Sequence, residues 1–583
     1  MSGQDADAAS AFTQTTLEEA SKILGVSHVP ETWISLPKDR WPDEWHKGVK
    51  DGTLVDPVCP LVTNLYGHPL AGLLWDKCSQ ERIQKCGFKK VEGWESLYVH
   101  PEKQLFLGVY VDDFHLCGKT DNLAAAWADL KKHIDFGEVS LFDGTTYLGC
   151  TQDKLKISDE DVQTKHDLFS SFLTDDTSVS AQDFEAKPIK LPPVQKKLNA
   201  QEKRKAKELT QKLKRKLKPT KGSKDEEFLM IMNEVKKTEV RGWYYQMKGA
   251  AQACVTRYLE LAQVDKSTLQ KVGTPCLDDH MLAPEDFESK GVLSSVCSQA
   301  VLKCLYMTRL ARPELYWAVN SLAREVTKWT VACDRRLHRL ISYIHCHEDA
   351  VMKSWVGNKA SECKLMLFCD ASFAGDLKDS KSTSGSLLCI VGSHTFCPIT
   401  WLCKKQGAVS HSSTEAEIIA LDTGLRIDGL PAMTLWDLVI NVLEPIKENV
   451  TPAVKKINLL PPETQELMNV DYMPTNIPKL SKRCKLIIME DNDAVIKMCM
   501  KVRAPTMRHV ARTHRINVDT LLERIHQEVG ICIKYVNTKL QIADIFTKGS
   551  FTVQTWNDLC KLFAVGPLWS RMSMICSLRE IKC

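Results

Sequence analysis

The sequence lacks most of the features that assign a chain to a specialised class of protein. Its 22 cysteines include no Cys-x-x-Cys pair, which argues against a disulfide framework or a zinc site and indicates reduced thiols inside a cell. No apolar run reaches the ~18 residues that cross a bilayer, and neither a signal peptide nor an internal repeat is visible. The formal net charge is only +4, so nucleic-acid binding has to be argued from local patches of charge.

The composition that remains is that of an ordinary globular chain. Hydrophobic residues make up 44% of the sequence and charged residues 26%, both within the usual range. A chain of 583 residues is too long for one hydrophobic core, so several domains are expected. Apolar runs of strand length alternate with helical patterns, which predicts an α/β and α+β multidomain protein without a membrane partner.

Acidic residues in the C-terminal half stand at the ends of predicted secondary-structure elements. Short apolar runs at 364–369, 386–391, 395–403 and 485–490 have the length and composition of strands. Asp370 follows the first run and Asp491 follows the last. Glu415 opens an apolar helix, and Asp544 lies in a late helical segment. Acids that converge from several elements in this way can hold a metal ion.

Five phrases in this half resemble the ribonuclease H domain of copia-type retrotransposon Pol polyproteins. In order along the chain they are Asp370-Ala-Ser-Phe-Ala-Gly-Asp376, Lys381-Ser-Thr-Ser-Gly385, Ser412-Ser-Thr-Glu-Ala-Glu417, Asp491-Asn-Asp-Ala494 and Ala543-Asp-Ile-Phe-Thr-Lys548. One such Asp is usually a cap or a surface residue, but five phrases in register are hard to obtain by chance. The resemblance implies a mixed sheet with flanking helices.

The resemblance also implies a set of metal ligands and a reaction. Asp370, Glu415, Asp491 and Asp544 take the places of the four acids, which would hold two Mg²⁺ (or Mn²⁺) ions and hydrolyse the RNA strand of an RNA–DNA hybrid. Glu415 is preferred to Glu417 because the family pattern places the acid directly after Thr. Glu417 lies two positions on and is expected to point to another part of the helix.

The N-terminal region contains a second group of acids. Tyr110-Val-Asp112-Asp113 stands between two apolar runs and resembles the polymerase signature of reverse transcriptases, and Asp7-x-x-x-Ala-Phe-x-Gln resembles their first carboxylate motif. The resemblance implies a palm in which Asp7 and Asp112 bridge two further metal ions, with Asp113 beside them. The alternative is a plain hairpin turn, since Asp is common in turns.

Two departures from the reverse transcriptase pattern weaken the prediction of polymerase activity. The chain begins six residues before Asp7, so the fingers residues that hold the incoming nucleotide are expected to be absent. Leu70 stands where the family usually carries a Gln that meets the nucleotide. We therefore expect an impaired polymerase, unless a missing upstream segment supplies the fingers.

The predicted domains follow from these matches and from changes in composition. They are a partial palm at 1–151, a linker and basic insertion at 152–235, a helical thumb and connection at 236–360, a ribonuclease H-like domain at 361–565 with an insertion at about 446–482, and a tail at 566–583. The basic insertion, residues 196–221, reads as a helix that either contacts phosphates or is solvated.

A short basic cluster before an amphipathic helix is the predicted nucleic-acid contact. Its members are Arg508, His509, Arg512, His514 and Arg515, which resemble a basic, His-containing phrase of the family and are expected to grip the backbone of the hybrid. Arg335, Arg336, His338 and Arg339 either touch phosphates as well or form the charged face of a helix.

Three functions remain open from the sequence. The first is a hybrid-specific ribonuclease with an impaired polymerase, the second a complete enzyme once its fingers are supplied, and the third an inactive nucleic-acid-binding relic. The resemblance implies template-primer nucleic acid, RNA–DNA hybrid and other Pol or Gag segments as partners. It places the protein in the cytoplasm, in virus-like particles, or in the nucleus.

Overall fold

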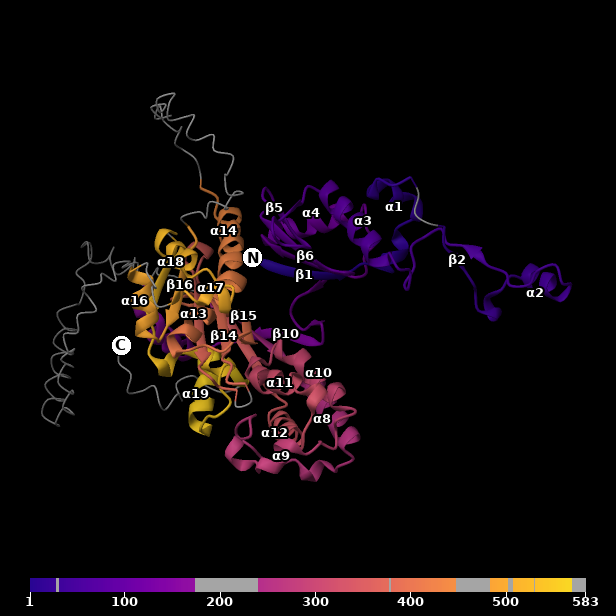
Figure 1. Ribbon diagram of the computed structural model, residues 1–583. Coiled ribbons are helices and arrows are strands. Elements are labelled where there is room, and N and C mark those ends of the chain that lie inside the picture. The colour runs from indigo at the N-terminus through magenta and orange to yellow at the C-terminus, as the bar shows by residue number, and fades with distance from the viewer. Residues whose placement is uncertain are drawn as a thin grey trace, which may run out of the picture. The chain divides into compact units, whose positions relative to one another are not determined.

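The computed structural model describes residues 1–27, 31–173, 240–376, 379–446, 483–501, 507–528 and 530–568, which form two compact units (Figure 1). Unit 1 comprises Met1–Asp153 and Leu435–Pro474, and unit 2 comprises Lys154–Thr434 and Thr475–Cys583. The basic insertion predicted at 196–221, nearly all of the insertion predicted at 446–482 and most of the predicted tail lie outside the described residues. The predicted domain boundaries stay predictions.

Unit 1 is built around a six-stranded sheet with the strand order β4-β5-β6-β7-β1-β8. Its strands are β1 (Ser2–Asp7), β4 (Lys89–Lys90), β5 (Leu97–His100), β6 (Leu105–Tyr110), β7 (Asp113–Gly118) and β8 (Ser140–Leu141). The helices before Asp153 are α1 (Leu17–Leu24), α2 (Asp43–Lys50), α3 (Ala71–Lys85) and α4 (Thr120–Leu130). A separate two-stranded sheet pairs β2 (Trp33–Ile34) with β3 (Cys59–Pro60).

The first strand of unit 1, Ser2–Asp7, contains no large apolar residue, so its sequence gives no strand signal of its own. In the structure β1 pairs antiparallel with β7 over its whole length, and Asp7 lies opposite Asp113. Ala6 and Ala8 are buried in the core with Phe114 and Trp127. The strand therefore forms because it pairs with β7 and packs its alanines into an apolar core, not because its own residues favour a strand.

The turn between β6 and β7 carries a strained residue. Val111 has φ +57°, a left-handed conformation that a β-branched side chain rarely adopts. The indole N–H of Trp75, on α3, donates a hydrogen bond of 2.6 Å to the carbonyl oxygen of Val111. Helix α3 thereby fixes the turn that presents Asp112 and Asp113.

Unit 2 contains a mixed sheet with the strand order β17-β16-β13-β14-β15-β12-β11. The strands are β11 (Arg241–Gln246), β12 (Ala350–Val356), β13 (Lys364–Ser372), β14 (Thr383–Gly392), β15 (Thr395–Lys405), β16 (Leu486–Glu490), β17 (Ile531–Tyr535) and β18 (Val565–Pro567), which pairs with β12. Strands β13, β14 and β15 are antiparallel, whereas β16 runs parallel to both β13 and β17. The four strands predicted in this half are confirmed.

Helices of unit 2 fall into two groups along the chain. One group is α8 (Lys248–Ala262), α9 (Pro284–Glu288), α10 (Cys297–Thr308), α11 (Tyr316–Ala323) and α12 (Val331–Cys346), which lie together in Figure 1. The other is α13 (Ser413–Gly424), α16 (Asp493–Lys501), α17 (Val510–Thr513), α18 (Val518–Gln527) and α19 (Val553–Phe563). Helix α5 (Asp159–Leu173) precedes both, and α14 (Leu430–Leu443) crosses the division between the units.

Two segments differ from the sequence-based expectation. Residues 243–248 were expected to be helical, but 241–246 form β11, which pairs with β12 from Arg241 opposite Val356 to Gln246 opposite Val351. Aromatic residues favour strands where a partner is available. The linker predicted from 152 onward contains α5, whose Phe169 is fully buried against Phe368 and Phe396.

Helix α13 approaches the sheet closely because small residues line the contact. Ala416 and Ala420 pack against Ala371 of β13. A Cβ on Gly424 would lie 2.9 Å from Sγ of Cys369 and 3.2 Å from Cβ of Ser386, so a larger residue would push the helix away. The close approach is what brings a carboxylate of α13 to β13.

The architecture agrees with the sequence at a coarse level. The protein is a mixed α/β multidomain chain, as predicted. Among the residues that the structure describes, no helix has both the length and the apolarity to cross a bilayer.

Candidate metal-binding centre

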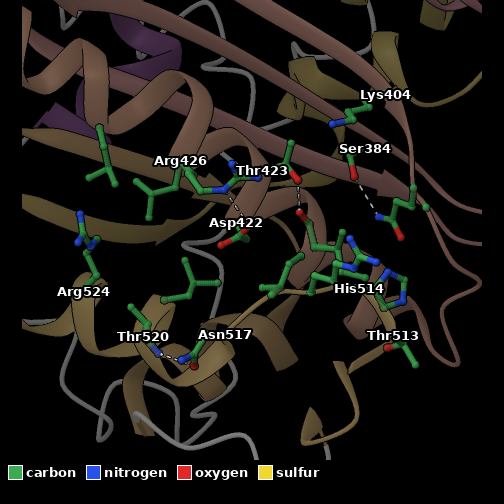
Figure 2. A pocket seen from close by; sticks show the side chains of 18 of the residues that line it. Ser384, Lys404, Asp422, Thr423, Arg426, Thr513, His514, Asn517, Thr520 and Arg524 are labelled. Carbon is green, nitrogen blue, oxygen red and sulfur yellow. Dashed lines mark hydrogen bonds and ion pairs between the residues drawn. The ribbon is translucent and has the colours of Figure 1, made fainter. Parts of the chain in front are cut away.

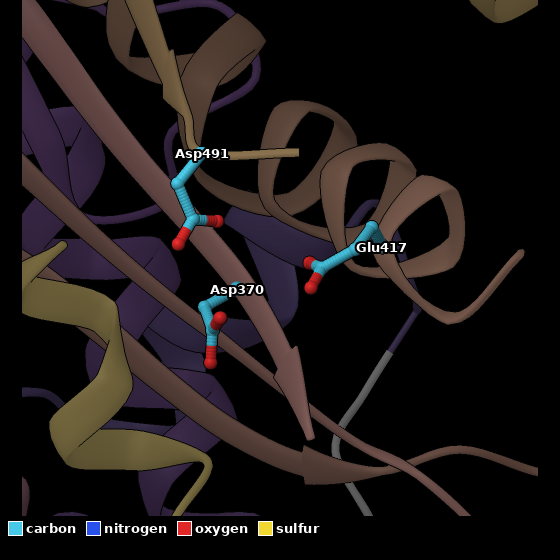
Figure 3. A group of neighbouring side chains, drawn as sticks. All are labelled: Asp370, Glu417 and Asp491. Carbon is cyan, nitrogen blue, oxygen red and sulfur yellow. The ribbon is translucent and has the colours of Figure 1, made fainter. Parts of the chain in front are cut away.

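Three carboxylates of unit 2 converge beside the central strand of the sheet. One oxygen of each of Asp370, Glu417 and Asp491 lies within 4.8 Å of the other two (Figure 3). Asp370 is 2% exposed and Glu417 is 7% exposed, while Asp491 is partly buried. Within the described part of the chain, no other group of three His, Cys, Asp or Glu residues meets this distance criterion.

The backbone explains why these three side chains meet. Asp370 lies in β13, and Asp491 directly follows β16, the parallel neighbour of β13. The carboxyl ends of parallel strands lie at the same edge of a sheet, so the two acids are neighbours in space. Glu417 comes from α13, which packs across β13 and β14. A strand, a strand end and a helix thus contribute one carboxylate each.

The predicted ligand Glu415 lies apart from the three carboxylates, and Glu417 lies beside Asp370 and Asp491 in its place. Two residues along a helix turn a side chain to a different face, and Glu415 faces the segment 507–515 instead of β13. Its Oε2 accepts a 2.9 Å hydrogen bond from the His411 N–H and lies 3.1 Å from Nε2 of His509. Its Oε1 lies 3.3 Å from Nε2 of His514. The acid of this phrase that meets Asp370 is therefore Glu417, two positions after the predicted one.

Asp544 lies next to Asp370 but outside the group of three. It belongs to the short 3-10 helix Ile542–Phe546 and is 8% exposed. Burial, together with the negative charge of Asp370, raises the pKa of Asp544 to about 8. The structure thus brings three of the four predicted acids together, namely Asp370, Asp491 and Asp544, and replaces the fourth.

The acids of the centre are buried beside one another, and both burial and their mutual repulsion raise their pKa values. Burial, followed by the charges of Asp370, Glu490 and Asp491, holds the pKa of Glu417 far above its usual range. Burial and the charge of Asp370 likewise raise the pKa of Asp491. Burial thus favours the protonated form of both acids unless a cation takes the place of the proton.

Thr547 and Lys548 are the hydrogen-bond and ion-pair partners of Asp370 and Asp544 within the protein. The Thr547 hydroxyl donates a hydrogen bond to Oδ2 of Asp370. Nζ of Lys548 lies 2.5 Å from Oδ1 of Asp544 and 3.6 Å from Oδ1 of Asp370. A Cβ on Gly385 would lie 2.6 Å from Cγ2 of Thr547, so this glycine lets the 546–548 segment reach the centre. Sequence reasoning quoted Lys548 within a phrase but assigned it no role.

Glu490 is a further buried acid that the sequence analysis missed. It ends β16, is fully buried, and accepts a 3.1 Å hydrogen bond from the Asn492 N–H through Oε1. Its Oε2 has no hydrogen-bond partner, and burial holds its pKa well above the usual range. The available signal was its position as an acid inside an apolar strand, immediately before Asp491.

The carboxylates of unit 1 form a looser arrangement. Asp7 and Asp113 end β1 and begin β7 as register partners, and the Ala8 N–H donates a 2.7 Å hydrogen bond to the backbone oxygen of Asp112. Burial, then a hydrogen bond and charge repulsion from Asp7, raise the pKa of Asp113 to about 6. Asp7 is exposed. The structure places the three predicted acids on one hairpin and its neighbouring strand.

The predicted nucleic-acid cluster divides into two kinds of residue. Arg508, Arg512 and Arg515 are exposed, as a backbone contact requires. His514 is not available for that role, because its side chain is only 2% exposed and faces the buried carboxylate of Glu415. His509 faces the same carboxylate with a side chain that is 39% exposed.

The basic residues of α12 have partners within the protein. Arg335 pairs with Asp286, Arg336 pairs with Asp279, and the Arg339 guanidinium donates to the Thr274 carbonyl oxygen at 2.9 Å. These contacts hold the connecting segments onto α12. They favour the interpretation of a charged helix face over that of a phosphate contact.

Comparison with known proteins finds relatives over part of the chain. It is 32% identical to the Retrovirus-related Pol polyprotein from transposon RE2 of Arabidopsis thaliana over 164 residues, which is 27% of this chain and 10% of that protein. It is 30% identical to the corresponding polyprotein from transposon RE1 over 164 residues, with the same coverage. A protein named Secreted RxLR effector protein 161, from Plasmopara viticola, is 32% identical over 122 residues, 21% of this chain and 81% of that protein.

These matches cover limited parts of the proteins concerned. The aligned region spans about a tenth of the length of either Pol polyprotein. No family model matches the chain.

Proposed function

Because the chain belongs to the retrovirus-related Pol polyproteins of copia-type retrotransposons, we propose that its carboxylate centre hydrolyses the RNA strand of RNA–DNA hybrids. The observation that carries the proposal is the convergence of Asp370, Glu417 and Asp491 within 4.8 Å. The strand order β15-β14-β13-β16-β17, antiparallel on one side of β13 and parallel on the other, supports a ribonuclease H-type fold.

The residues present fit divalent metal ions. Oε2 of Glu417 and Oε2 of Glu490 are buried without a hydrogen-bond partner, and carboxylate oxygens are the ligands that Mg²⁺ prefers. Asp370, Glu417 and Asp491 would hold such ions, with Asp544 beside them. Bound Mg²⁺ or Mn²⁺ supplies charge that activates an attacking water and stabilises the leaving oxygen of a phosphodiester.

The protein's own groups prepare the centre for this role. The Thr547 hydroxyl orients Asp370 by donating to its Oδ2, and the Gln541 side chain donates a 2.8 Å hydrogen bond to the Cys369 carbonyl oxygen, which fixes the strand beside it. Lys548 offsets part of the negative charge of Asp370 and Asp544. Because strands and a helix carry the acids, their positions are set before substrate arrives.

Two features support an RNA-containing duplex as the substrate: the positive charge of the neighbouring surface and the 2′-hydroxyl groups that distinguish RNA from DNA. Arg508, Arg512 and Arg515 are exposed cations suited to the phosphates of a nucleic-acid backbone. Selecting an RNA strand requires contacts to its 2′-hydroxyl groups across a wide minor groove. Single-stranded RNA and duplex DNA are therefore expected to be poor substrates.

The test is cleavage of an end-labelled RNA–DNA hybrid with Mg²⁺, beside single-stranded RNA and duplex DNA. We expect cleavage of the hybrid alone and its loss in Asp491→Asn. Asp493→Asn is the matched control, since Asp493 is exposed, pairs with Lys497 and lies two residues away. Failure of the folded wild-type protein to cut the hybrid would leave a nucleic-acid-binding relic as the better description.

A second activity, RNA-directed DNA synthesis, has one observation in its favour. Asp7 and Asp113 are register partners on neighbouring strands, at the turn that also carries Asp112. Two features argue against efficient synthesis: Leu70 at the start of α3, where related polymerases usually carry Gln, and an acid group that is not drawn together as the nuclease centre is. Primer extension on an RNA template tests it, with little or no extension expected.

A further inference from the structure

A pocket lies in unit 2 beside the end of the hairpin that carries Asp370. It has a volume of about 370 Å³, within the range of small-molecule sites in proteins, roughly 300–1,000 Å³. Ser372, Asp376 and Thr383 line it from the β13–β14 hairpin. Helix α11, residues 275–277 and 279, and single residues of α9 and α12 form the rest of the wall. Apart from β13, these elements contribute no carboxylate to the candidate metal-binding centre.

The lining of this pocket differs from that of a larger groove in the same unit. That groove has a volume of about 940 Å³ and lies between α13, the end of β15 and residues 513–524 (Figure 2). Thr513, His514 and Arg515 line it, so it belongs to the basic surface already considered for the RNA–DNA hybrid. The smaller pocket shares no lining residue with it, and its ligand has to be inferred separately.

Apolar side chains form much of the wall of the smaller pocket. They are Pro275, Leu277, Phe287, Trp317, Ala318 and Leu322. The Phe287 ring carries the Arg336 guanidinium over it, with the guanidinium carbon 5.4 Å from the ring centroid. Aromatic side chains pack well against a further ring. An apolar ring system therefore suits this wall better than a sugar or a polyol.

Most charged residues that line the pocket have partners within the protein. Arg336 pairs with Asp279. Nζ of Lys405 lies 2.5 Å from Oδ2 of Asp376. Glu325 also has a contact of its own. The charges of these residues are therefore engaged without a ligand.

Arg324 is the exception among the lining charges. Its Nη1 is buried and has no hydrogen-bond partner, and within the residues that the structure describes no carboxylate oxygen lies within 4 Å of its guanidinium nitrogens. The Cys403 thiol feels its charge but stays neutral, because burial raises the pKa of Cys403 to about 11. A partly buried guanidinium without a counter-charge is costly. A bound anion would supply that charge.

Helix α11 holds its two key lining residues in place. Trp317 and Arg324 are seven residues apart, about two turns, and so lie on one side of the helix. The Asn320 side chain donates a 2.8 Å hydrogen bond to the Cys403 carbonyl oxygen, which fixes α11 to β15. A Cβ on Gly549 would overlap the Trp317 ring, so this ring is closely packed against the chain. The ring and the cation are thus presented together from a fixed helix.

We propose that this pocket binds a small organic anion, a carboxylate carried on an apolar ring system. The carboxylate pairs with the Arg324 guanidinium, since charge-assisted hydrogen bonds between these groups are strong and can be bidentate. The ring system packs against Phe287, Trp317 and Leu322. Neither metal nor nucleic acid takes part in this binding.

The test measures binding of 2-naphthoate to the full chain by isothermal titration calorimetry, without added metal or nucleic acid. The neutral probe 2-naphthamide has nearly the same shape. Arg324→Met removes the charge and keeps an apolar stem, whereas Arg324→Lys keeps the charge. Lys303→Met is the matched control, because Lys303 is an exposed cation that does not line the pocket. Thermal unfolding of each variant shows that it is folded.

We expect saturable binding of 2-naphthoate that is about 10- to 100-fold weaker in Arg324→Met, the factor that a hydrogen bond to a charged group commonly contributes. Arg324→Lys should recover most of this loss. Lys303→Met should stay within about twofold of wild type, because an exposed charge contributes little. 2-Naphthamide should bind wild type and Arg324→Met alike. Equal losses for the two probes would overturn the assignment of Arg324 to the anion.

A second variant, Ser321→Leu, tests the pocket itself. Ser321 lines it from α11 and donates its hydroxyl to the Ala318 carbonyl oxygen of the same helix at 2.8 Å. Leucine is a good helix former and its larger side chain fills the space, so both probes should lose binding. Unchanged binding of 2-naphthoate in this variant, or no saturable binding in wild type, overturns the proposal.

This inference and the proposed hydrolysis fail separately. A protein that binds 2-naphthoate through Arg324 but cuts no hybrid would retain this site and lose the proposed function. A protein that cuts hybrid but binds no 2-naphthoate would retain the function and lose this site.

Discussion

The two groups of acids in this protein differ in how deeply they are buried and in how closely their side chains converge. In unit 2, Asp370 and Glu417 are almost completely buried, and strand, helix and strand end converge on one point. In unit 1, Asp7 is exposed, and the acids share one hairpin and its neighbouring strand. Burying several acids side by side is costly without a compensating cation. Such a cost persists in a fold when the acids have a joint task, which is why the carboxylate centre of unit 2 is the stronger candidate for a functional site.

The same contrast appears in what surrounds each group. Lys548, Thr547 and the close approach of α13 at Gly424 all serve the centre in unit 2. Unit 1 instead holds its acids through backbone pairing and through the Trp75 contact to Val111. The first arrangement fixes side chains, whereas the second fixes a turn.

Replacing one acid in each group should give the largest difference. Glu417→Gln is expected to lower hybrid hydrolysis by about 10³-fold, because losing a metal ligand forfeits several kcal/mol of transition-state stabilisation. Asp113→Asn is expected to change the same rate by less than about twofold. Initial rates at saturating Mg²⁺ measure both.

Glu415→Gln is the matched control on α13. It is expected to retain far more activity than Glu417→Gln, because its carboxylate faces His509 and His514 instead of Asp370. Equal losses in the two variants would show that the assignment of Glu417 over Glu415 is wrong.

The response to Mg²⁺ should depend on pH more strongly in unit 2 than in unit 1. Asp544, with a pKa raised to about 8, keeps its proton in the folded state through neutral pH, whereas Asp113, with a pKa of about 6, has lost it. A raised folded-state pKa means that the metal-free fold loses stability as pH rises from about 4 to about 8. Mg²⁺ must displace that proton, so its binding strengthens over the same upper range.

Calorimetric titration with Mg²⁺ at pH 6 and pH 8.5 measures this effect. We expect tighter binding at the higher pH and proton release at the lower one, detected by comparing buffers of different ionisation enthalpy. A saturating excess of 100 Kd would stabilise the fold by about 2.7 kcal/mol. Asp370→Asn should remove the strong binding, and a pH-independent affinity in the wild type would contradict the raised pKa values.

Removing the lysine beside the carboxylate centre should have a smaller effect. Lys548→Met leaves Asp370 and Asp544 without their ion-pair partner and is expected to destabilise the metal-free protein by ~1 kcal/mol, a low value because the lysine side chain is 38% exposed. Urea unfolding in EDTA measures it. Lys497→Met, which breaks an exposed pair with Asp493, serves as the control and should fall within about 0.5 kcal/mol of wild type.

The smallest expected effect tests the strained turn of unit 1. Val111→Gly should stabilise unit 1 by roughly 0.5 kcal/mol, because relief of the left-handed strain slightly exceeds the extra entropy of glycine in the unfolded chain. Val109→Gly, in β6 of the same hairpin, should destabilise instead. Urea unfolding followed by Trp fluorescence compares the two, and a loss of stability in both variants would show that the turn is not strained.

The sequence predicted the elements of unit 2 well where apolar runs and polar phrases alternate. The strands around Asp370 and Asp491 and the helix that follows Ser412 are confirmed. The choice between Glu415 and Glu417 failed because a linear pattern does not say which helical face meets the sheet. That face is set by Ala416, Ala420 and Gly424, whose small size only has meaning once β13 lies beside them.

Other features had no signal that a single sequence could supply. Residues 2–7 are nearly all polar, and β1 exists because β7 and β8 pair with it. The basic phrase around His514 predicted an exposed grip, but the buried partner of this histidine comes from a segment far earlier in the chain. Long-range partners of this kind decide both the fold of a polar segment and the role of a charged one.

The parallel pairing of β16 with β13 has a consequence for the order in which this protein folds. Hairpins β13–β14 and β14–β15 join residues that are close along the chain and can form early, with Asp370 already in place. Leu365 pairs with Leu486, however, so forming that ladder requires residues far apart along the chain to meet, at the entropic cost of closing a long loop. Asp491 therefore reaches Asp370 late, and a nascent chain would pass through a state with two of its three central acids but no complete metal centre.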